Sequence, residues 1–83
     1  MTRQFVVGST SGAPTVGQTT FQSDFLINAF VDYILVNNVP ETQLGTTPAF
    51  THNYLTGVIN RSPNTWANGD ELVVVYSNCS CNN

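Results

Sequence analysis

The stretch NGDELVVVY, residues 68–76, decides the fold. An Asn-Gly turn signal leads directly into the densest run of β-branched residues in the sequence. Valine is stiff at χ1 and suits a pleated surface better than a helix. In a strand, Leu72, Val74 and Tyr76 point to one face and the two valines between them point to the other. Because both faces are apolar, the stretch predicts a central strand that is covered on both sides.

Length and composition predict one small domain. The sequence has 83 residues, of which 41% are hydrophobic and 11% aromatic, too many for a disordered chain. We expect a single β domain over residues 1–83, in which residues 1–18 form an N-terminal strand or arm and residues 77–83 a flexible tail. So small a domain buries little of its surface and often depends on disulfides, metals or oligomerisation. Oligomerisation is favoured, because the sequence gives little support to the other two.

Charged residues make up only 8% of the chain, against roughly 25% in ordinary soluble domains. There is no lysine, Arg3 and Arg61 are the only cations besides the N-terminus, and the net charge is −3. Phosphate neutralisation needs clustered Lys and Arg, so the composition argues against nucleic-acid binding and against attraction to anionic membranes. No signal peptide is visible, and no apolar run approaches the roughly 18 residues of a membrane span. We therefore expect synthesis in the cytoplasm without a signal peptide.

Short apolar segments separated by Gly, Pro and Asn predict about five to six strands. The segments after the first lie near Thr19–Phe21, at Phe30–Val36, at Phe50–Ile59 and at Leu72–Tyr76, and Gln4–Gly8 is the first strand. Their spacing is typical of an antiparallel sandwich or small barrel, so the predicted fold class is all-β. Residues 20–29 also fit a helical pattern, which leaves a short helix at residues 23–29 as an alternative. Residues 9–17 are expected to form a loop, or an arm that orders against a neighbouring subunit.

Two of these segments carry more detailed expectations. Alternation places Phe30, Asp32, Ile34 and Val36 on one side of their strand and the residues between them on the other. Asn37-Asn38-Val39-Pro40 is expected to end this strand, and residues 41–48 to form a polar loop. Gly57 interrupts the segment at residues 50–59 and is interpreted as a bulge or a close approach of two backbones.

The sequence offers no catalytic or metal-binding constellation. His52 is the single histidine and lies near no recognisable nucleophile, so we interpret it as a partly exposed strand residue. Asp70 and Glu71 are adjacent and would point to opposite faces of a strand, so they would not share one site easily. No enzyme activity and no cofactor are predicted.

Cys79 and Cys81 supply only half of a four-ligand zinc site, and His52 does not complete it within one chain. A disulfide between the two would close a small, strained ring. Intermolecular disulfides fit the geometry better, and the remaining alternatives are free thiols and metal shared between subunits.

Aromatic residues are the candidate contacts. A domain this small can hardly enclose every aromatic ring, so we expect five of them to contact a partner: Phe5, Phe21, Phe25, Tyr54 and Trp66. Trp66 lies in a loop, where binding aromatics are common, and could stack on a sugar beside Asn64, Asn68 and a tyrosine. The opposing interpretation is that Trp66 folds back into the core.

The motif order resembles small β modules of tailed-bacteriophage virion proteins, as found in head fibres, capsid decoration proteins and tail fibres. The resemblance runs from about Thr19 to Tyr76, and its most telling part is the ending, Trp66 followed by Ala-Asn-Gly-Asp-Glu and a β run that closes on Tyr76. It implies a non-enzymatic structural protein in the virion that forms a homo-oligomer, commonly a trimer, and contacts other virion proteins. It carries over no catalytic residue and does not include the Cys79–Asn83 tail. The alternatives are a glycan-binding module centred on Trp66 and a subunit of an extracellular filament or surface layer.

Overall fold

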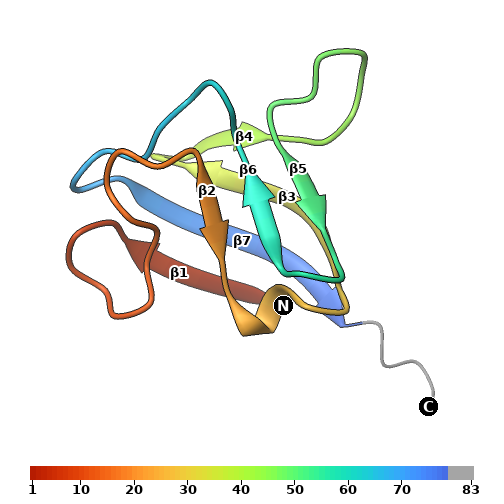
Figure 1. Cartoon of the computed structure of the whole chain (residues 1–83), viewed down its shortest axis with the longest axis horizontal. Coiled ribbons are helices and arrows are strands. Elements are labelled where there is room, and N and C mark those ends of the chain that lie inside the picture. Colours follow the sequence, from red (N-terminus) through yellow and green to blue (C-terminus); the bar gives the residue numbers. More distant parts are fainter. Residues whose placement is uncertain (79–83) are drawn as a thin grey trace.

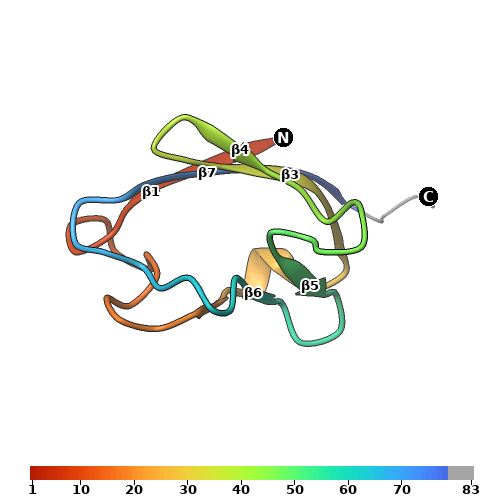
Figure 2. The same ribbon diagram turned by 90° about the horizontal axis from the view of Figure 1, so that it is seen from above.

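The protein is an antiparallel β-sandwich of two sheets, and the computed structural model describes residues 1–78 (Figures 1 and 2). The larger sheet has the strand order β1-β7-β3-β4, formed by Thr2–Val6, Glu71–Asn78, Ala29–Val36 and Val39–Glu41. The smaller sheet has the order β2-β6-β5, formed by Thr20–Gln22, Val58–Asn60 and Thr51–Asn53. A single 3-10 turn, η1, covers Asp24–Leu26. Within residues 1–78 no helix is long and apolar enough to cross a membrane.

The central-strand prediction is confirmed for one face only. Strand β7 lies between β1 and β3, and its residues Leu72, Val74 and Tyr76 are buried against the smaller sheet. On the opposite face Val73 and Val75 are partly exposed. Figure 2 shows why, since the smaller sheet covers only one side of the larger one. The expectation of cover on both sides of this strand is therefore met by the chain on one side only.

An irregularity in β3 changes which of its residues face the core. The register with β7 shifts between Val31 and Tyr33, and Asp32 has no partner in the ladder. Val31 consequently joins Ile34 on the buried face, whereas strict alternation put them on opposite sides. A bulge of one residue reverses the side-chain direction of the strand that follows it.

Residues 37–41 form a hairpin that the sequence analysis missed. Asn37 and Asn38 have φ values of 53° and 68°, the positive values that a two-residue type I′ turn requires. The chain returns as β4, in which Pro40 stands opposite Leu35. The interpretation of Pro40 as a strand terminator is wrong because β4 is an edge strand, where proline is tolerated.

A second hairpin replaces the single strand expected at residues 50–59. Strands β5 and β6 pair antiparallel and are joined by the turn at residues 54–57. The side-chain oxygen of Asn53 accepts bonds from the backbone N–H groups of Leu55 and Thr56 at 3.0 and 3.3 Å. Gly57 has φ +73°, and a Cβ on it would lie 2.6 Å from the carbonyl oxygen of Ser23. The interpretation of Gly57 as a close backbone approach is confirmed, although it marks a turn and not a bulge.

The remaining segments follow the prediction in part. Residues 20–29 contain both alternatives, a short strand and one 3-10 turn. Residues 9–17 pack on their own chain, since Pro14 is buried and Gly17 donates its N–H to the carbonyl oxygen of Trp66 at 2.8 Å. Ser77 and Asn78 belong to β7 and not to a tail.

Candidate functional site

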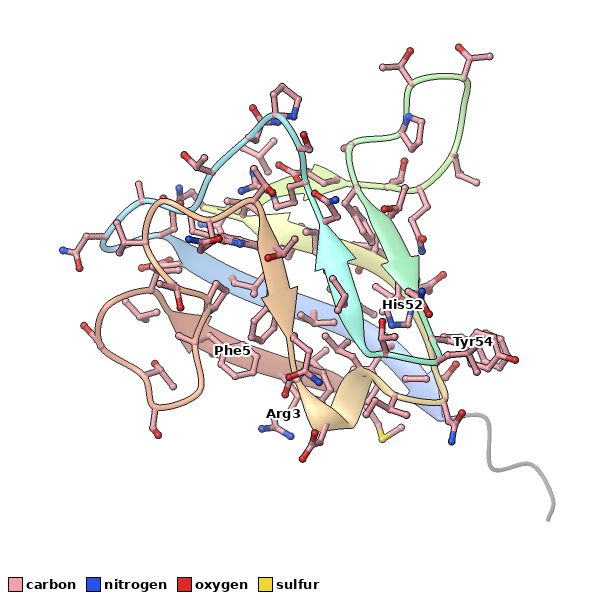
Figure 3. All side chains as sticks on the ribbon, viewed as in Figure 1. Arg3, Phe5, His52 and Tyr54 are labelled. Atoms are coloured by element: carbon pink, nitrogen blue, oxygen red, sulfur yellow. The ribbon has the colours of Figure 1, made fainter. Side chains whose placement is uncertain are left out.

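Three of the five aromatic residues expected at contacts lie in the core. Phe5, Phe21 and Trp66 are only 5%, 3% and 1% exposed, so they present no ring to a partner or a sugar. Phe25 is partly buried, and Tyr54 is 49% exposed. In Figure 3, Tyr54 projects outward beyond the end of β5, whereas Phe5 lies within the outline of the sandwich. The stacking site predicted at Trp66 is therefore wrong, and the alternative of a folded-back core residue is confirmed.

The buried rings form a continuous row through the sandwich. Phe21 meets Phe5 and Trp66 edge to face, with centroid separations of 5.3 and 6.4 Å. The Arg3 guanidinium carbon lies 4.6 Å from the centroid of Phe25, and that of Arg61 lies 4.4 Å from the centroid of Trp66. Each arginine is placed for a cation–π interaction. Both cationic side chains are thus engaged with the chain's own rings.

Arg61 is also held by a carboxylate. Its Nε and Nη2 donate to the two oxygens of Glu41 at 2.8 and 2.7 Å in a bidentate pair, and both side chains are mostly buried. Glu41 stands opposite Ile34 on the core side of β4. The pair closes the edge of the sandwich beside Trp66, and Nη1 of Arg61 is buried there without a hydrogen-bond partner among residues 1–78.

The ring of His52 is bonded to the backbone. Its Nε2 lies 2.9 Å from the carbonyl oxygen of Leu26. A carbonyl oxygen only accepts, so Nε2 carries the proton and Nδ1 is the nitrogen left to accept in the neutral ring. The bond ties β5 to η1, which gives His52 a structural role.

Asp70 and Glu71 also have structural bonds. Asp70 accepts from the Ala67 N–H at 2.8 Å and from the Asn37 amide at 3.0 Å. The Asn37 side-chain oxygen in turn accepts the Glu71 N–H at 2.9 Å. The bond from Ala67, and next that from Asn37, lower the pKa of Asp70 below its ordinary value. These contacts lock the turn before β7 to the β3–β4 hairpin.

No cluster of three or more His, Cys, Asp or Glu residues able to hold a metal occurs within residues 1–78. The predicted intermolecular disulfide partners, Cys79 and Cys81, lie outside the described residues. Asn64 and Asn68, named with Trp66 as sugar contacts, are exposed but share no platform with its enclosed ring.

The most distinctive surface is the uncovered side of the larger sheet, which we call the outer face. Its centre consists of two cross-strand pairs, Tyr33 with Val75 and Leu35 with Val73, and all four side chains are partly exposed. Around them lie Thr2, Gln4 and Val6 of β1, Phe30 of β3, Pro40 of β4, and Glu71 and Ser77 of β7. Phe30 is 57% exposed. The centre of the face carries no charge.

The outer face is shallowly hollowed at one end. The hollow is lined on the sheet by Gln4, Val6, Glu71 and Val73, and Asn38 of the β3–β4 turn also contributes. In Figure 2 this hairpin rises above the plane of the sheet on the side away from the smaller sheet. The hairpin therefore gives the outer face a raised border.

Two positions on the free edges of the larger sheet, Val6 of β1 and Pro40 of β4, have no N–H available for another strand. Met1 and Val7 form backbone hydrogen bonds with Tyr76 and Asp70. Because bonding residues alternate along an antiparallel strand, the odd-numbered residues of β1 bond to β7. The even-numbered residues therefore direct their backbone N–H and C=O groups away from the sheet. At Val6 these outward groups are already occupied, because its N–H donates to Thr10 Oγ1 and its carbonyl accepts from Ser9 and Thr10. At the other edge, Pro40 in the middle of β4 has no N–H to offer.

The sequence alone did not show that one face of the larger sheet stays uncovered by the chain. The prediction of a strand covered on both sides holds for the inner face of β7, whereas Val73 and Val75 on its outer face are partly exposed. Two signals could have shown the hairpins: Asn-Asn between β segments, and Asn53 followed by Gly57. Comparisons with models of protein families, with curated proteins and with solved structures find no match to this chain.

Proposed function

We propose that this protein is a non-enzymatic structural component of a bacteriophage particle that works by self-association and by docking on other virion proteins. The observation that carries the proposal is the outer face, which presents an uncharged apolar centre and is left uncovered by the smaller sheet. Such a face is suited to be covered by another protein surface.

The inner architecture supports a mechanical role. The aromatic row and the Arg61–Glu41 pair tie the two sheets into one unit, and the hydrogen bonds of His52 and Asp70 connect loops to strands. His52, Asp70 and Glu41 thereby have structural partners. The described surface is polar mainly through Thr, Ser, Asn and Gln, which suits a protein packed among neighbours.

The assignment to a phage particle rests on the motif order between Thr19 and Tyr76. This motif order supports a head-fibre, a capsid-decoration and a tail-fibre role equally. Glycan binding through Trp66 is not retained, because its ring is enclosed. Pro40 and the bonds that occupy Val6 disfavour a filament in which β1 of one copy pairs with β4 of the next.

Quantitative mass spectrometry of purified particles of the encoding phage tests the proposal. We expect the chain at a fixed copy number per particle that survives extensive washing, like that of the known shell or fibre proteins. Native mass spectrometry of the purified full-length chain, with and without reductant, is expected to show a discrete oligomer. A chain that is absent from particles and monomeric in solution would contradict the proposal.

A further inference from the structure

We infer that β1 is a docking edge for an extended segment of another protein, which joins the larger sheet as a fifth strand and places an acidic side chain opposite Arg3. The inference rests on the proposed docking and specifies the chemistry of the partner, an extended segment with Asp or Glu between β-forming residues. When a strand is added to a sheet edge, main-chain hydrogen bonds give affinity and alternate side chains give specificity.

The edge of β1 offers unpaired backbone groups at Thr2 and Gln4. Arg3 is one of the residues that bond to β7, so the N–H and C=O groups of Thr2 and Gln4 on either side of it point away from the sheet. No hydrogen bond with another part of residues 1–78 occupies these groups, and both residues are exposed. Their two-residue spacing matches that of the outward groups on a second extended chain.

The other three edges of the two sheets are less suitable. Strand β1 has five residues, whereas the edge strands β2, β4 and β5 have three each. Pro40 has no N–H to offer in the middle of β4. The Thr20 carbonyl oxygen on β2 accepts from Trp66 Nε1 at 3.2 Å, and the Tyr54 carbonyl oxygen directly after β5 accepts from the Asn28 N–H at 2.7 Å. Among the strands described, β1 therefore presents the longest open edge.

The bonds at Val6 set the point where the added strand ends. The Val6 N–H donates to Thr10 Oγ1, and its carbonyl oxygen accepts from Ser9 and Thr10. An added strand therefore pairs with Thr2 and Gln4 and stops before Val6. Because this stretch is short, its main-chain bonds give weak binding, and a side-chain contact is needed to select the partner.

Arg3 supplies that contact in the middle of the open edge. Its guanidinium carbon lies 4.6 Å from the centroid of Phe25 and 5.6 Å from that of Phe5 (Figure 3). The rings hold the guanidinium in place and leave the N–H donors at its rim accessible to a carboxylate. Within residues 1–78 no carboxylate forms an ion pair with Arg3, including that of Asp24, which precedes Phe25 in the chain.

Charge selects the occupant of the edge. Opposite Arg3 an antiparallel neighbour exchanges no hydrogen bonds with β1, and at such positions the two side chains approach most closely. Because only Thr2 and Gln4 are open, a second copy paired about a two-fold axis would put Arg3 opposite Arg3, and like charges directly opposite are destabilising. A carboxylate at this position instead forms a charge-assisted pair. The edge therefore suits a segment with Asp or Glu there and not another copy of β1.

The experiment is an NMR titration of the isotope-labelled full-length chain, with reductant present, by the synthetic peptide acetyl-Ser-Thr-Thr-Glu-Thr-Thr-Ser-amide. The threonines favour an extended chain, and the central Glu is the acidic residue. We expect saturable binding at millimolar peptide, with chemical-shift changes and slowed hydrogen exchange at the amides of Thr2 and Gln4. The matched peptides carry Gln or Lys in place of Glu. They are expected to bind about threefold and about tenfold more weakly, respectively.

Three variants of the chain test the edge and the charge separately. Gln4→Pro removes an outward N–H at an edge position where proline is compatible with a strand, and it is expected to weaken binding by about tenfold or more. Gln4→Ala keeps that N–H and is the matched control, expected to leave binding unchanged. Arg3→Glu is expected to reverse the preference, so that the Lys peptide binds about fivefold more tightly than the Glu peptide. Circular dichroism verifies that each variant folds.

The outcomes separate this inference from the function on which it rests. Binding that Gln4→Pro weakens and Gln4→Ala spares, with the preference reversed in Arg3→Glu, supports the docking edge. Absence of binding, binding without shifts at Thr2 and Gln4, or equal affinity for the Glu and Lys peptides overturns it. Shifts of these two amides with the concentration of the chain alone overturn it in favour of a second copy. None of these failures alters the copy number expected in purified particles, so the proposed function is tested independently.

Discussion

On the inner face of the larger sheet, Ile34 and Val74 are fully enclosed, whereas their chain neighbours Leu35 and Val73 on the outer face remain partly exposed. The residues are of the same kind and lie on the same two strands. The difference arises only from the position of the smaller sheet, which covers one side (Figure 2). The comparison teaches that residues of the same kind on the same strands are enclosed on the face that the chain covers and stay partly exposed on the face that it leaves uncovered.

Truncating one residue on each face breaks this comparison most directly. Ile34→Ala is expected to lower the free energy of unfolding by about 4 kcal/mol, because the enclosed site cannot collapse around the missing atoms. Leu35→Ala is expected to cost about 1 kcal/mol in the dilute monomer, since its side chain already meets solvent. Urea denaturation of both variants at low concentration measures the difference. Equal losses would show that the outer face is as well covered as the inner face.

Two glutamates extend the comparison to charged groups. Glu41 lies on the core side, paired with Arg61, and Glu71 lies on the outer side and is exposed. Glu41→Ala leaves a buried guanidinium without its partner and is expected to cost about 3 kcal/mol. Glu71→Ala is expected to change stability by less than about 0.5 kcal/mol. Thermal unfolding measures the stability of both variants. The double variant Glu41→Leu with Arg61→Met is expected to recover much of the stability that Glu41→Ala loses. Failure of that recovery would mean that the pair contributes more than the relief of a buried charge.

The smaller sheet must stay in place for the two faces to differ, and Gly57 helps to fix it. Gly57→Ala combines a φ of +73° with a Cβ that would meet the Ser23 carbonyl oxygen, so we expect a loss of about 2 kcal/mol or more. Gly45→Ala is the matched control, because Gly45 has φ +88° but an added Cβ would have no neighbour within 4 Å. Its loss is expected to be about 1 kcal/mol. Similar losses at both sites would remove the close approach as a cause.

The smallest expected effect concerns the turn that joins the two faces at the start of β7. The pKa of Asp70 is lowered in the folded chain, so this carboxylate stabilises the fold above its ordinary pKa of 3.8. That contribution is lost as the pH falls through the lowered value. We expect the melting temperature of the wild type to fall more between pH 5 and pH 2.5 than that of Asp70→Asn. Parallel pH profiles would contradict a role for this carboxylate.

Much of the fold was predictable because local chemistry specifies it. The all-β class and the central position of β7 followed from the run at residues 68–76, and Phe30–Val36 lies within β3 as expected. The register shift at Asp32 was not predictable, because a bulge depends on the pairing of two strands and leaves no distinct signal in one. The hairpin at Asn37-Asn38 was missed although its signal was present, because Pro40 was given too much weight.

For the candidate site, too, some features could be predicted from the sequence and others could not. The composition argued against partners attracted by charge, and it directed attention to apolar contacts. It did not indicate which aromatic residues are free, because Phe5, Phe21 and Trp66 are enclosed by contacts between segments distant in sequence. The sequence by itself determined the all-β class, the long strands β3 and β7 and the apolar character of both faces of β7, since these depend on residues close together in the chain. Only the tertiary structure decided which face of the larger sheet the chain covers itself, because that depends on where β2, β5 and β6 pack.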